Sequence, residues 1–287
     1  MREFFRATKD HINKRLLELV SFKNLPQQEL FTAAFYSLET SAKRFRPLLI
    51  FALVKDFNGD LNKALDPSCA LELVHTYSLI HDDLPCTDND DLRHGKPTLH
   101  KKFSDTTAVL TGDFLLTYAF AILSHSPSLS DSQKISLISS LSKKSGALGM
   151  IGGQFVDLAS ENKTIDEKTL RFMYEHKTSA LLECSMEMGS TICSLDTKLT
   201  SNLIFFAKTL GYAYQIADDI FDATLSSTDL GKSASDQKNC KSTPVSLLGL
   251  QNAKKLYDSL SQQALDYLPE NANHLKDLAS VIIKREF

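Results

Sequence analysis

Apolar residues recur along most of the chain at the spacing of one helical face. Between residues 70 and 80 they follow intervals of three and four, which predicts a helix that ends at Asp82 and Asp83. Similar patterns predict further helices at about 3–20, 28–38, 47–57, 106–124, 132–146, 166–192, 200–224, 243–267 and 272–285. Convincing strand alternation is not found. The pattern predicts an all-α fold, with residues 1–287 forming one large helical bundle.

Composition narrows the class of protein. The chain has 287 residues, of which 43% are hydrophobic, and it contains only 11 glycines and 8 prolines. So few glycines and prolines disfavour a β-sandwich, a collagen-like fibre and a disordered linker protein. The 32 basic and 35 acidic residues leave a formal net charge of −3, which argues against generic binding to nucleic acid or acidic membranes. Any site that binds anions through basic residues must therefore be confined to a small part of the molecule.

The predicted location is the cytoplasm. Five widely spaced cysteines without a CxxC pair favour a reducing compartment. The N-terminus lacks the apolar core of a signal peptide. The longest apolar stretch, at about 110–123, is too short to span a bilayer and contains Asp113. We therefore expect no membrane span.

An acidic cluster closes the apolar helix at 70–83. Residues 82–91 spell DDLPCTDNDD, and basic residues follow between Arg93 and Lys102. A solvated loop with salt bridges is the structural alternative, but this run ends a buried helix. Pro85 disfavours helical geometry at the residue before it. A break there would return Asp88 to the side of Asp82, so that both carboxylates could bind one metal ion.

A second acidic cluster lies within an apolar helix, in QIADDIFD at 215–222. Asp218 and Asp222 are four residues apart and share a helical face. Uncompensated carboxylates are costly to bury there, so a positive group should face them. A neighbouring lysine is the structural alternative to a metal ion. Carboxylates without a cysteine or histidine pair suit Mg²⁺, which also binds substrate phosphates.

Cations that could hold phosphate occur in small sets. Each alone is more often a surface charge than a ligand, although arginine favours bidentate contact with phosphate. The candidates are Lys43, Arg44, Arg46, Arg93, Lys96, Lys177, Lys232 and Lys241.

These motifs together resemble the trans-prenyltransferase family, the head-to-tail isoprenyl diphosphate synthases. One DDxxD-like motif would be weak evidence, but two of them with the intervening blocks in family order are specific. The resemblance covers about 200 residues, through SAKRFRP (41–47), ELVHTYSLIHDDLPCTDNDDLRHGKPT (72–98), GDFLL (112–116), GGQFVDL (152–158), HKTSAL (176–181), QIADDIFD (215–222), and LGK followed by KST.

The resemblance implies an all-helical fold of the isoprenoid synthase type around a central cavity, three Mg²⁺ ions and a homodimer. By resemblance, Asp82, Asp88 and Asp218 are direct metal ligands, and Asp83, Asp219 and Asp222 support them. The implied substrate residues are Arg93, Lys177 and Lys232 at the allylic diphosphate, Lys43, Arg46 and His75 at isopentenyl diphosphate, His94 and Lys241 at the substrates, and Thr178 and Gln215 facing the allylic cation. In this family the departing pyrophosphate takes the proton.

Two departures from the family pattern stand out. Ser41 and Ala42 replace the usual glycine pair before Lys43. Arg93 is followed by His94 where the family usually has a second arginine. A histidine titrates near neutrality, so we expect weaker binding of isopentenyl diphosphate with a pH dependence.

Tyr77 and Ser78, just before the first aspartate motif, bear on product length. An elongating chain stops where it meets a bulky side chain. In the family, a bulky aromatic residue at this position with two extra residues in the motif is the pattern of bacterial-type farnesyl diphosphate synthases. The resemblance implies a C15 product from dimethylallyl or geranyl diphosphate, with a geranylgeranyl or geranyl diphosphate synthase as the alternative.

Three other functions are weighed against chain elongation. A terpene cyclase normally carries an Asn/Ser/Glu pattern at its second metal site, where this chain has Asp218, Asp219 and Asp222. A metal phosphohydrolase built on His75 and His81 would need further metal ligands that we cannot assign. A non-catalytic partner subunit is disfavoured by the intact aspartates of both motifs.

Overall fold

The computed structural model describes residues 2–40, 42–93, 95–224 and 242–284. Helices dominate this part of the chain, as the sequence predicts. The first half forms α1 (Arg2–Leu19), α2 (Gln28–Leu38), α3 (Phe45–Asp56), the 3-10 helix η1 (Leu61–Ala64), α4 (Leu65–Asp82), β1 (Leu92–Arg93), β2 (Lys96–Pro97), α5 (Leu99–Lys102), α6 (Asp105–His125) and α7 (Asp131–Ser145). The two short strands, which the sequence pattern did not predict, pair as one antiparallel hairpin.

The second half differs from the predicted helices at three places. It forms α8 (Met150–Ala159), α9 (Glu167–Tyr174), the π turn η2 (Glu175–Ser179), α10 (Ala180–Cys193), α11 (Thr197–Thr224), α14 (Pro244–Leu248), α15 (Leu250–Asp266) and α16 (Asn273–Lys284). Helix α8 was not predicted. The helix expected at 166–192 contains a π turn, and the one expected at 243–267 is divided at Gly249, where φ is +79°.

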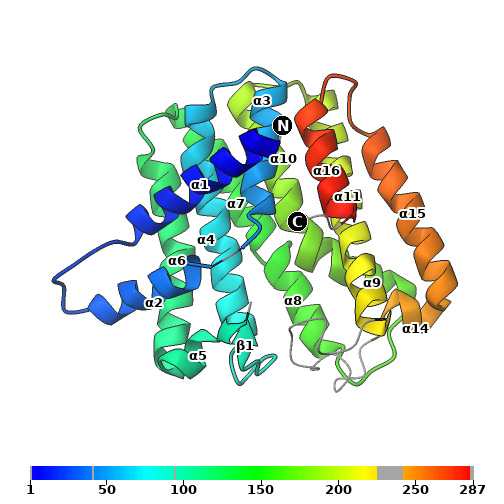
Figure 1. The fold of residues 1–287 in the computed structure, drawn as a ribbon, viewed down its shortest axis with the longest axis horizontal. Coiled ribbons are helices and arrows are strands. Elements are labelled where there is room, and N and C mark those ends of the chain that lie inside the picture. Colours follow the sequence, from blue (N-terminus) through cyan, green and yellow to red (C-terminus); the bar gives the residue numbers. More distant parts are fainter. Residues whose placement is uncertain (1, 41, 94, 225–241, 285–287) are drawn as a thin grey trace.

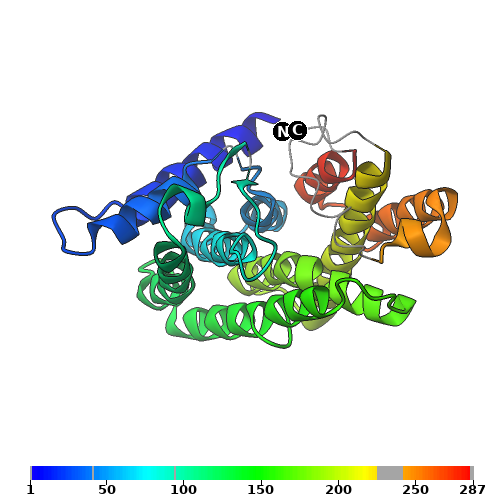
Figure 2. The same ribbon diagram turned by 90° about the horizontal axis from the view of Figure 1, so that it is seen from below.

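The centre of the molecule is made by α3, α4 and α10. Helices α2 and α15 lie at opposite ends of the long axis, with these three between them (Figures 1 and 2). In α3 every residue from Pro47 to Val54 is buried, and α10 packs on α3, α7 and α11. A helix surrounded by protein can be apolar on every side.

Helix α11 joins two hydrophobic clusters. Its first half carries Phe206, which is fully buried in the main core together with residues of α3, α4, α6 and α10. Its second half carries Ile216, which packs with Leu170 of α9 and Ala253 of α15 in a smaller cluster. The second acidic motif lies on this second half, so packing on both sides fixes its position.

Helix α6 is, within the described residues, the one helix long and apolar enough to cross a membrane by length and composition. It is longer than the apolar stretch noted in the sequence. Core helices of globular proteins meet the same criteria. Helix α6 packs against α2, α4, α5 and α7, and 39% of its apolar stretch is buried.

Buried carboxylates on α4 are neutralised by arginines from the neighbouring segments. Asp66 accepts hydrogen bonds from Arg15 of α1, at 3.2 Å, and from Ser126. Glu72 Oε1 lies 2.6 Å from Nη1 of Arg44, and the two side chains are only 3% and 2% exposed. An unpaired charge buried at either position would cost several kcal/mol. These pairs therefore hold the segments before α3 against α4, the helix that ends in the first acidic motif.

Replacing Glu72 with methionine tests this pairing. The variant keeps a side chain of similar length but leaves the Arg44 guanidinium buried without its carboxylate, so we expect the free energy of unfolding to fall by about 3–5 kcal/mol. The matched control is Lys14→Met, which removes an exposed ion pair with Glu18 and should cost about 0–1 kcal/mol. Urea denaturation measures both. A Glu72→Met loss no larger than the control's would contradict the assignment.

Candidate active site

The chain turns back on itself directly after α4. The backbone N–H of Asp88 donates to the carbonyl of Asp82 at 2.9 Å, and Thr87 Oγ1 donates to the same carbonyl at 2.7 Å. Helix α4 thus ends at Asp82, and a tight loop brings Asp88 beside it. This confirms the break expected from Pro85.

His81 docks the end of α4 on α6. Its Nε2 lies 3.1 Å from the carbonyl oxygen of Val109, and its ring meets Tyr77 edge to face at 5.7 Å between centroids. The ring rests against Gly112, where a Cβ atom would lie 2.0 Å from Nε2. The sequence offered no role for His81, but the structure gives it one, since it sets how α4 lies on α6 one residue before the first aspartate.

Asp82 is held by a residue that the sequence analysis did not single out. Gln154 of α8 donates from Nε2 to Asp82 Oδ1 at 2.8 Å. Three residues further along α8, Asp157 Oδ2 accepts from Lys177 Nζ at 2.5 Å, and the Asp157 side chain is 7% exposed. Helix α8 therefore connects the first acidic motif to the π turn η2.

Lys177 lies among carboxylates from two parts of the chain. Burial disfavours its charged form, but the negative charges of Asp157, Asp82 and Asp88 outweigh that effect and raise the pKa of Lys177 above its ordinary value. Asp82 and Asp88 therefore act on one ammonium group. The structure therefore places these two residues, predicted as metal ligands, near Lys177, which was predicted to hold the diphosphate.

Thr178 and Gln215 contact each other. The hydroxyl of Thr178, on η2, donates to Oε1 of Gln215 on α11 at 2.9 Å. The Thr178 side chain is buried, and the two residues adjoin Lys177 and the second acidic motif in sequence. The structure thus brings together the two residues predicted to face the allylic cation.

In the second motif, Asp219 accepts a hydrogen bond from Tyr174 of α9 at 2.7 Å. Burial raises the pKa of Tyr174, and the charges of Asp219 and Asp157 raise it further. Asp157 thus acts on both Tyr174 and Lys177. It links the second motif, through Tyr174, to the region where Asp82 and Asp88 lie. Asp218 and Asp222, on the same helix, are partly buried.

Asp83 and Arg93 form a pair directed toward β1. Arg93 Nε donates to Asp83 Oδ1 at 2.9 Å, and Arg93 Nη2 lies 3.6 Å from Asp90. Burial raises the pKa of Asp83 to about 6, although Arg93 opposes the shift. Arg93, expected at the diphosphate, is therefore held by the first acidic motif itself.

A pocket lies between α4, α2 and the hairpin, beside Asp83 and Arg93. It is lined by Tyr36, Ser37, Thr40, Ala42, Arg44, Glu72, His75, Thr76, Leu79, Ile80, Asp83, Arg93, Lys96, Pro97, Thr98 and Leu99. His75 and Arg93 of the predicted substrate residues thus share one pocket. Lys43 contacts the ring of Phe45, with Nζ 5.8 Å from its centroid.

Arg46 carries a buried nitrogen without a partner. Its Nε makes no hydrogen bond to any residue that the structure describes. Burial lowers the pKa of Arg46, and the charge of Glu72 opposes that shift. A buried guanidinium nitrogen with unused hydrogen-bonding capacity fits an anionic ligand such as a diphosphate.

Tyr77 and Ser78 are buried beneath the first motif. The Tyr77 side chain is 4% exposed, and its hydroxyl finds no hydrogen-bond partner in the described part of the chain. Burial, aided by the charge of Asp82, raises the pKa of Tyr77 to about 12. Ser78 has a small side chain, whose Oγ donates to the carbonyl of His75. Tyr77 is therefore the bulky residue of the two.

The donors present fit Mg²⁺. Within the described residues, no three histidine, cysteine, aspartate or glutamate side chains stand close enough to hold a metal ion by themselves. Mg²⁺ does not require such a cage, because it keeps several waters and completes its shell with substrate phosphates. The groups that surround Lys177 are carboxylates, which are the oxygen donors that Mg²⁺ prefers.

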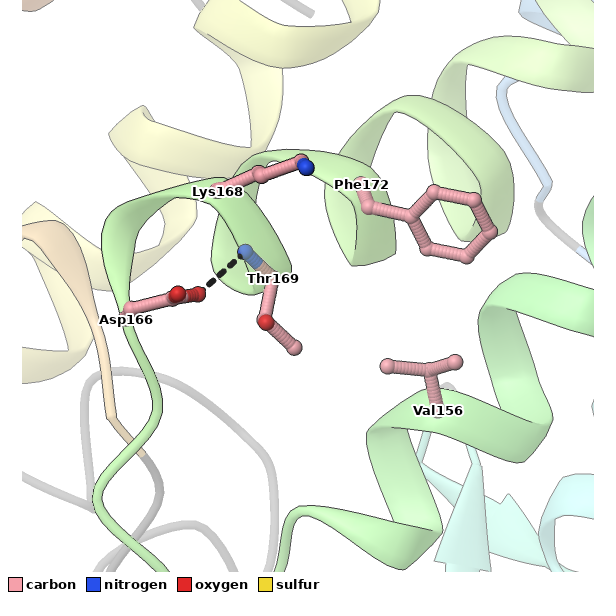
Figure 3. A pocket seen from close by; sticks show the side chains of 5 residues that line it. All are labelled: Val156, Asp166, Lys168, Thr169 and Phe172. Carbon is pink, nitrogen blue, oxygen red and sulfur yellow. Dashed lines mark hydrogen bonds between the residues drawn. The ribbon is translucent and has the colours of Figure 1, made fainter.

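A further pocket lies between α8 and α9 and contains none of the predicted site residues. It is lined by Val156, Asp166, Lys168, Thr169 and Phe172 (Figure 3). Asp166 caps α9 there by accepting from the backbone of Thr169 at 2.7 Å. Of the predicted residues, His94, Lys232 and Lys241 lie outside the described part of the chain.

Comparison with known proteins relates this arrangement to one family. Residues 27–282 match the polyprenyl synthetase profile. A farnesyl diphosphate synthase of Geobacillus stearothermophilus is 41% identical over 258 residues, covering 89% of this chain and 86% of that protein. A chloroplastic geranylgeranyl pyrophosphate synthase of Catharanthus roseus is 40% identical, covering 88% and 72%. A Helicobacter pylori geranyltransferase, solved in complex with magnesium and isoprenyl diphosphate, superposes with a TM-score of 0.86 at 33% identity, covering 99% and 97%.

The contact between His81 and Gly112 can be tested by a double-mutant cycle. Gly112→Ala forces the His81 ring out of its place, so we expect the free energy of unfolding to fall by about 1–3 kcal/mol. In a His81→Ala background the same change should cost less, giving a coupling energy of about 0.5–3 kcal/mol. Urea unfolding of the four proteins measures it. Additive losses would mean that His81 does not set this packing.

Proposed function

The chain belongs to the polyprenyl synthetase family and is a prenyltransferase, and we propose that it condenses isopentenyl diphosphate with dimethylallyl or geranyl diphosphate to give farnesyl diphosphate and pyrophosphate. The observation that carries this proposal is the position of Lys177, on which Asp82, Asp88 and Asp157 act together. An ammonium group among carboxylates is suited to hold a diphosphate that arrives with divalent metal.

The allylic diphosphate binds, in this proposal, between the two acidic motifs. Asp82, Asp88 and Asp218 are the direct ligands of Mg²⁺, with Asp83, Asp219 and Asp222 in support. We expect three ions, each of which neutralises charge on the leaving pyrophosphate. Lys177, Arg93 and Lys232 hold the diphosphate oxygens as fixed positive charges.

Thr178 and Gln215 face the carbon from which the diphosphate departs. The Thr178 proton is directed at Gln215 Oε1, so the remaining lone pairs of the Thr178 oxygen stay available to a developing positive charge. The bond between the allylic carbon and the diphosphate oxygen breaks, and the double bond of isopentenyl diphosphate supplies the electrons of the new carbon–carbon bond. The proton lost from the isopentenyl unit goes to the departing pyrophosphate, so no side chain is needed as the base.

Isopentenyl diphosphate binds beside α3 and α4. Lys43, Arg46 and His75 hold its diphosphate, with His94 and Lys241 as further substrate contacts. The buried, unpartnered Nε of Arg46 supports this placement, because a diphosphate oxygen would satisfy it.

Tyr77 supports the C15 product. Its ring is buried on α4 below the first motif, where an elongating chain would meet it. A geranylgeranyl diphosphate synthase is the alternative, since a relative of that name is nearly as similar to this chain as the farnesyl diphosphate synthase.

The proposal also covers the domain organisation, the oligomeric state and the cellular location of the protein. We propose that residues 1–287 are one domain, because α11 carries both hydrophobic clusters, and that the chain works as a homodimer, as the family does. The free thiols of Cys69 and Cys184, both buried, support a reducing cytoplasm.

The activity is tested by incubating the protein with Mg²⁺, isopentenyl diphosphate and each allylic diphosphate, then separating the dephosphorylated products by chromatography. We expect a C15 product with dimethylallyl and geranyl diphosphate, and none after chelation with EDTA. Asp82→Ala and Asp218→Ala should lower kcat by about 10²–10³ or more. The control is Asp131→Ala, an exposed acid on α7, which should retain full activity.

Two results would overturn the proposal. Absence of pyrophosphate release with every substrate pair would favour a non-catalytic subunit. Pyrophosphate release without a longer prenyl product would favour a cyclase or a hydrolase.

Tyr77→Ala tests the product length. Removing the ring opens space below the first motif, so we expect products of C20 and longer while substrate consumption continues. Ser78→Ala removes only a hydroxyl bonded within the same helix and serves as the matched control. An unchanged C15 product from Tyr77→Ala would show that another residue stops the chain.

A further inference from the structure

Helices α9 and α10 form one continuous helical run that is interrupted by a π turn. The turn η2 covers Glu175–Ser179, and it contains Lys177 and Thr178, which the proposed function places at the allylic substrate. A π turn is an uncommon, wider turn of helix and occurs often at functional sites. Its position at these two residues calls for a physical cause.

One side of the π turn lies against α8 at Gly153. A Cβ atom on Gly153 would lie 2.1 Å from the backbone nitrogen of Lys177 and 2.7 Å from the carbonyl carbon of His176. These are main-chain atoms, so no side-chain rotation could relieve the contact. Helix α8 can approach the turn this closely only because residue 153 is glycine.

A second close contact with the π turn is made by α11, at Gly211. A Cβ atom there would lie 2.4 Å from Ser179 Oγ and 2.8 Å from its Cα atom. Ser179 is fully buried, and its hydroxyl donates to the carbonyl of Lys208, also on α11, at 2.9 Å. The last residue of the turn is therefore fixed to α11 by close packing and by a hydrogen bond.

The first residue of the turn is held by charge. Glu175 lies 2.8 Å from Lys208 Nζ and 2.8 Å from Arg171 Nε. Burial opposes ionisation of Glu175, but the two cations outweigh it and lower its pKa. Glu175 and Ser179 are thus both attached to the segment of α11 around Lys208, so the ends of the π turn share one support.

We propose that Gly153 and Gly211 are positioning residues, which hold the π turn between α8 and α11 and thereby direct Lys177 at the diphosphate and Thr178 at the reacting carbon of the allylic substrate. The proposal rests on the proposed function for the identity of that substrate. A side chain at either glycine would push the backbone of residues 176–179, and the hydrogen bonds from Lys177 to Asp157 and from Thr178 to Gln215 would shift with it. Displacements near 1 Å in such groups can cost about 10² in rate.

The predicted effect is confined to one substrate. Of the residues assigned to isopentenyl diphosphate, Lys43 precedes α3, Arg46 lies in its first turn and His75 lies on α4, whereas the π turn packs on α8, α9, α10 and α11. Gly153→Ala and Gly211→Ala should therefore raise the KM for geranyl diphosphate or lower kcat by about 10- to 100-fold. The KM for isopentenyl diphosphate should stay within about twofold, which a general loss of structure would not produce.

Two variants sharpen the test. Gly189→Ala is the matched control, because Gly189 lies on α10 of the same helical run and the three atoms nearest to its Cβ would all belong to the flexible side chain of Leu53, at 3.0–3.2 Å. We expect it to leave both KM values unchanged. Gly211→Ala in a Ser179→Gly background removes the Oγ and Cβ atoms that the new methyl group meets, so the loss caused by Gly211→Ala should be smaller there. Comparing Gly211→Ala with and without Ser179→Gly keeps the proposal testable if Gly153→Ala does not fold.

A binding measurement separates this proposal from the proposed function. Isothermal titration of inorganic pyrophosphate in Mg²⁺ buffer reports on the diphosphate subsite without turnover, and we expect the Kd to rise about tenfold or more in Gly153→Ala and Gly211→Ala. If the wild-type protein forms no prenyl product but the variants bind pyrophosphate more weakly, the function fails and the positioning role stands. If the wild-type protein is active and both variants keep its kinetics and its Kd, or if Gly189→Ala weakens binding equally, the positioning role is wrong.

Discussion

The main physical constraint on this structure is the accumulation of negative charge where several carboxylates surround the ammonium group of Lys177. Asp82 is the last residue of α4, Asp88 lies in the loop that follows it, and Asp157 comes from α8. Carboxylates brought together repel one another, and burial makes each of them more costly. Lysine neutralises only part of this charge. In the proposed function, the remaining negative charge would attract divalent cations, and those cations would allow an anionic diphosphate to bind beside aspartates.

This constraint explains why the aspartates are held from outside the acidic motifs. Gln154 binds Asp82, Tyr174 binds Asp219, and Arg93 binds Asp83. Each partner is a donor, and each lies on an element other than the helix or loop that carries its aspartate. A carboxylate oriented in this way keeps one oxygen engaged and can present the other to a metal ion, so little reorganisation is needed when the substrate arrives.

The sequence predicted the charged residues of the site better than the residues that orient them. Residues 82–91 and 215–222 stand out because acids are unusual in apolar surroundings, and Pro85 indicated the turn that returns Asp88 to Asp82. Helix α8 was missed because Gly152 and Gly153 weaken a helical pattern in its first turn, although close packing on the π turn requires a glycine at 153. Tyr174 and Asp157 look like ordinary amphipathic positions until the helices are packed. The pairing of Arg93 with Asp83 depends on a short hairpin that no periodicity could indicate.

In the proposed function, product length depends on the same docking that positions the end of α4 at Asp82. Tyr77 and Asp82 are five residues apart on one unbroken helix, which corresponds to a rise of about 7.5 Å. His81, between them, is fitted against Gly112 and touches the Tyr77 ring. The proposed floor and the first metal ligand therefore cannot move independently. In that proposal, the space available to a growing prenyl chain would be set by the geometry of a helix fixed on α6, whereas a floor built on a loop would let that space vary. A buried tyrosine hydroxyl without a partner costs about 1–3 kcal/mol, so the hydroxyl of Tyr77 does not itself add stability. In the proposed function, the Tyr77 ring acts through the volume that it fills at a fixed position on α4.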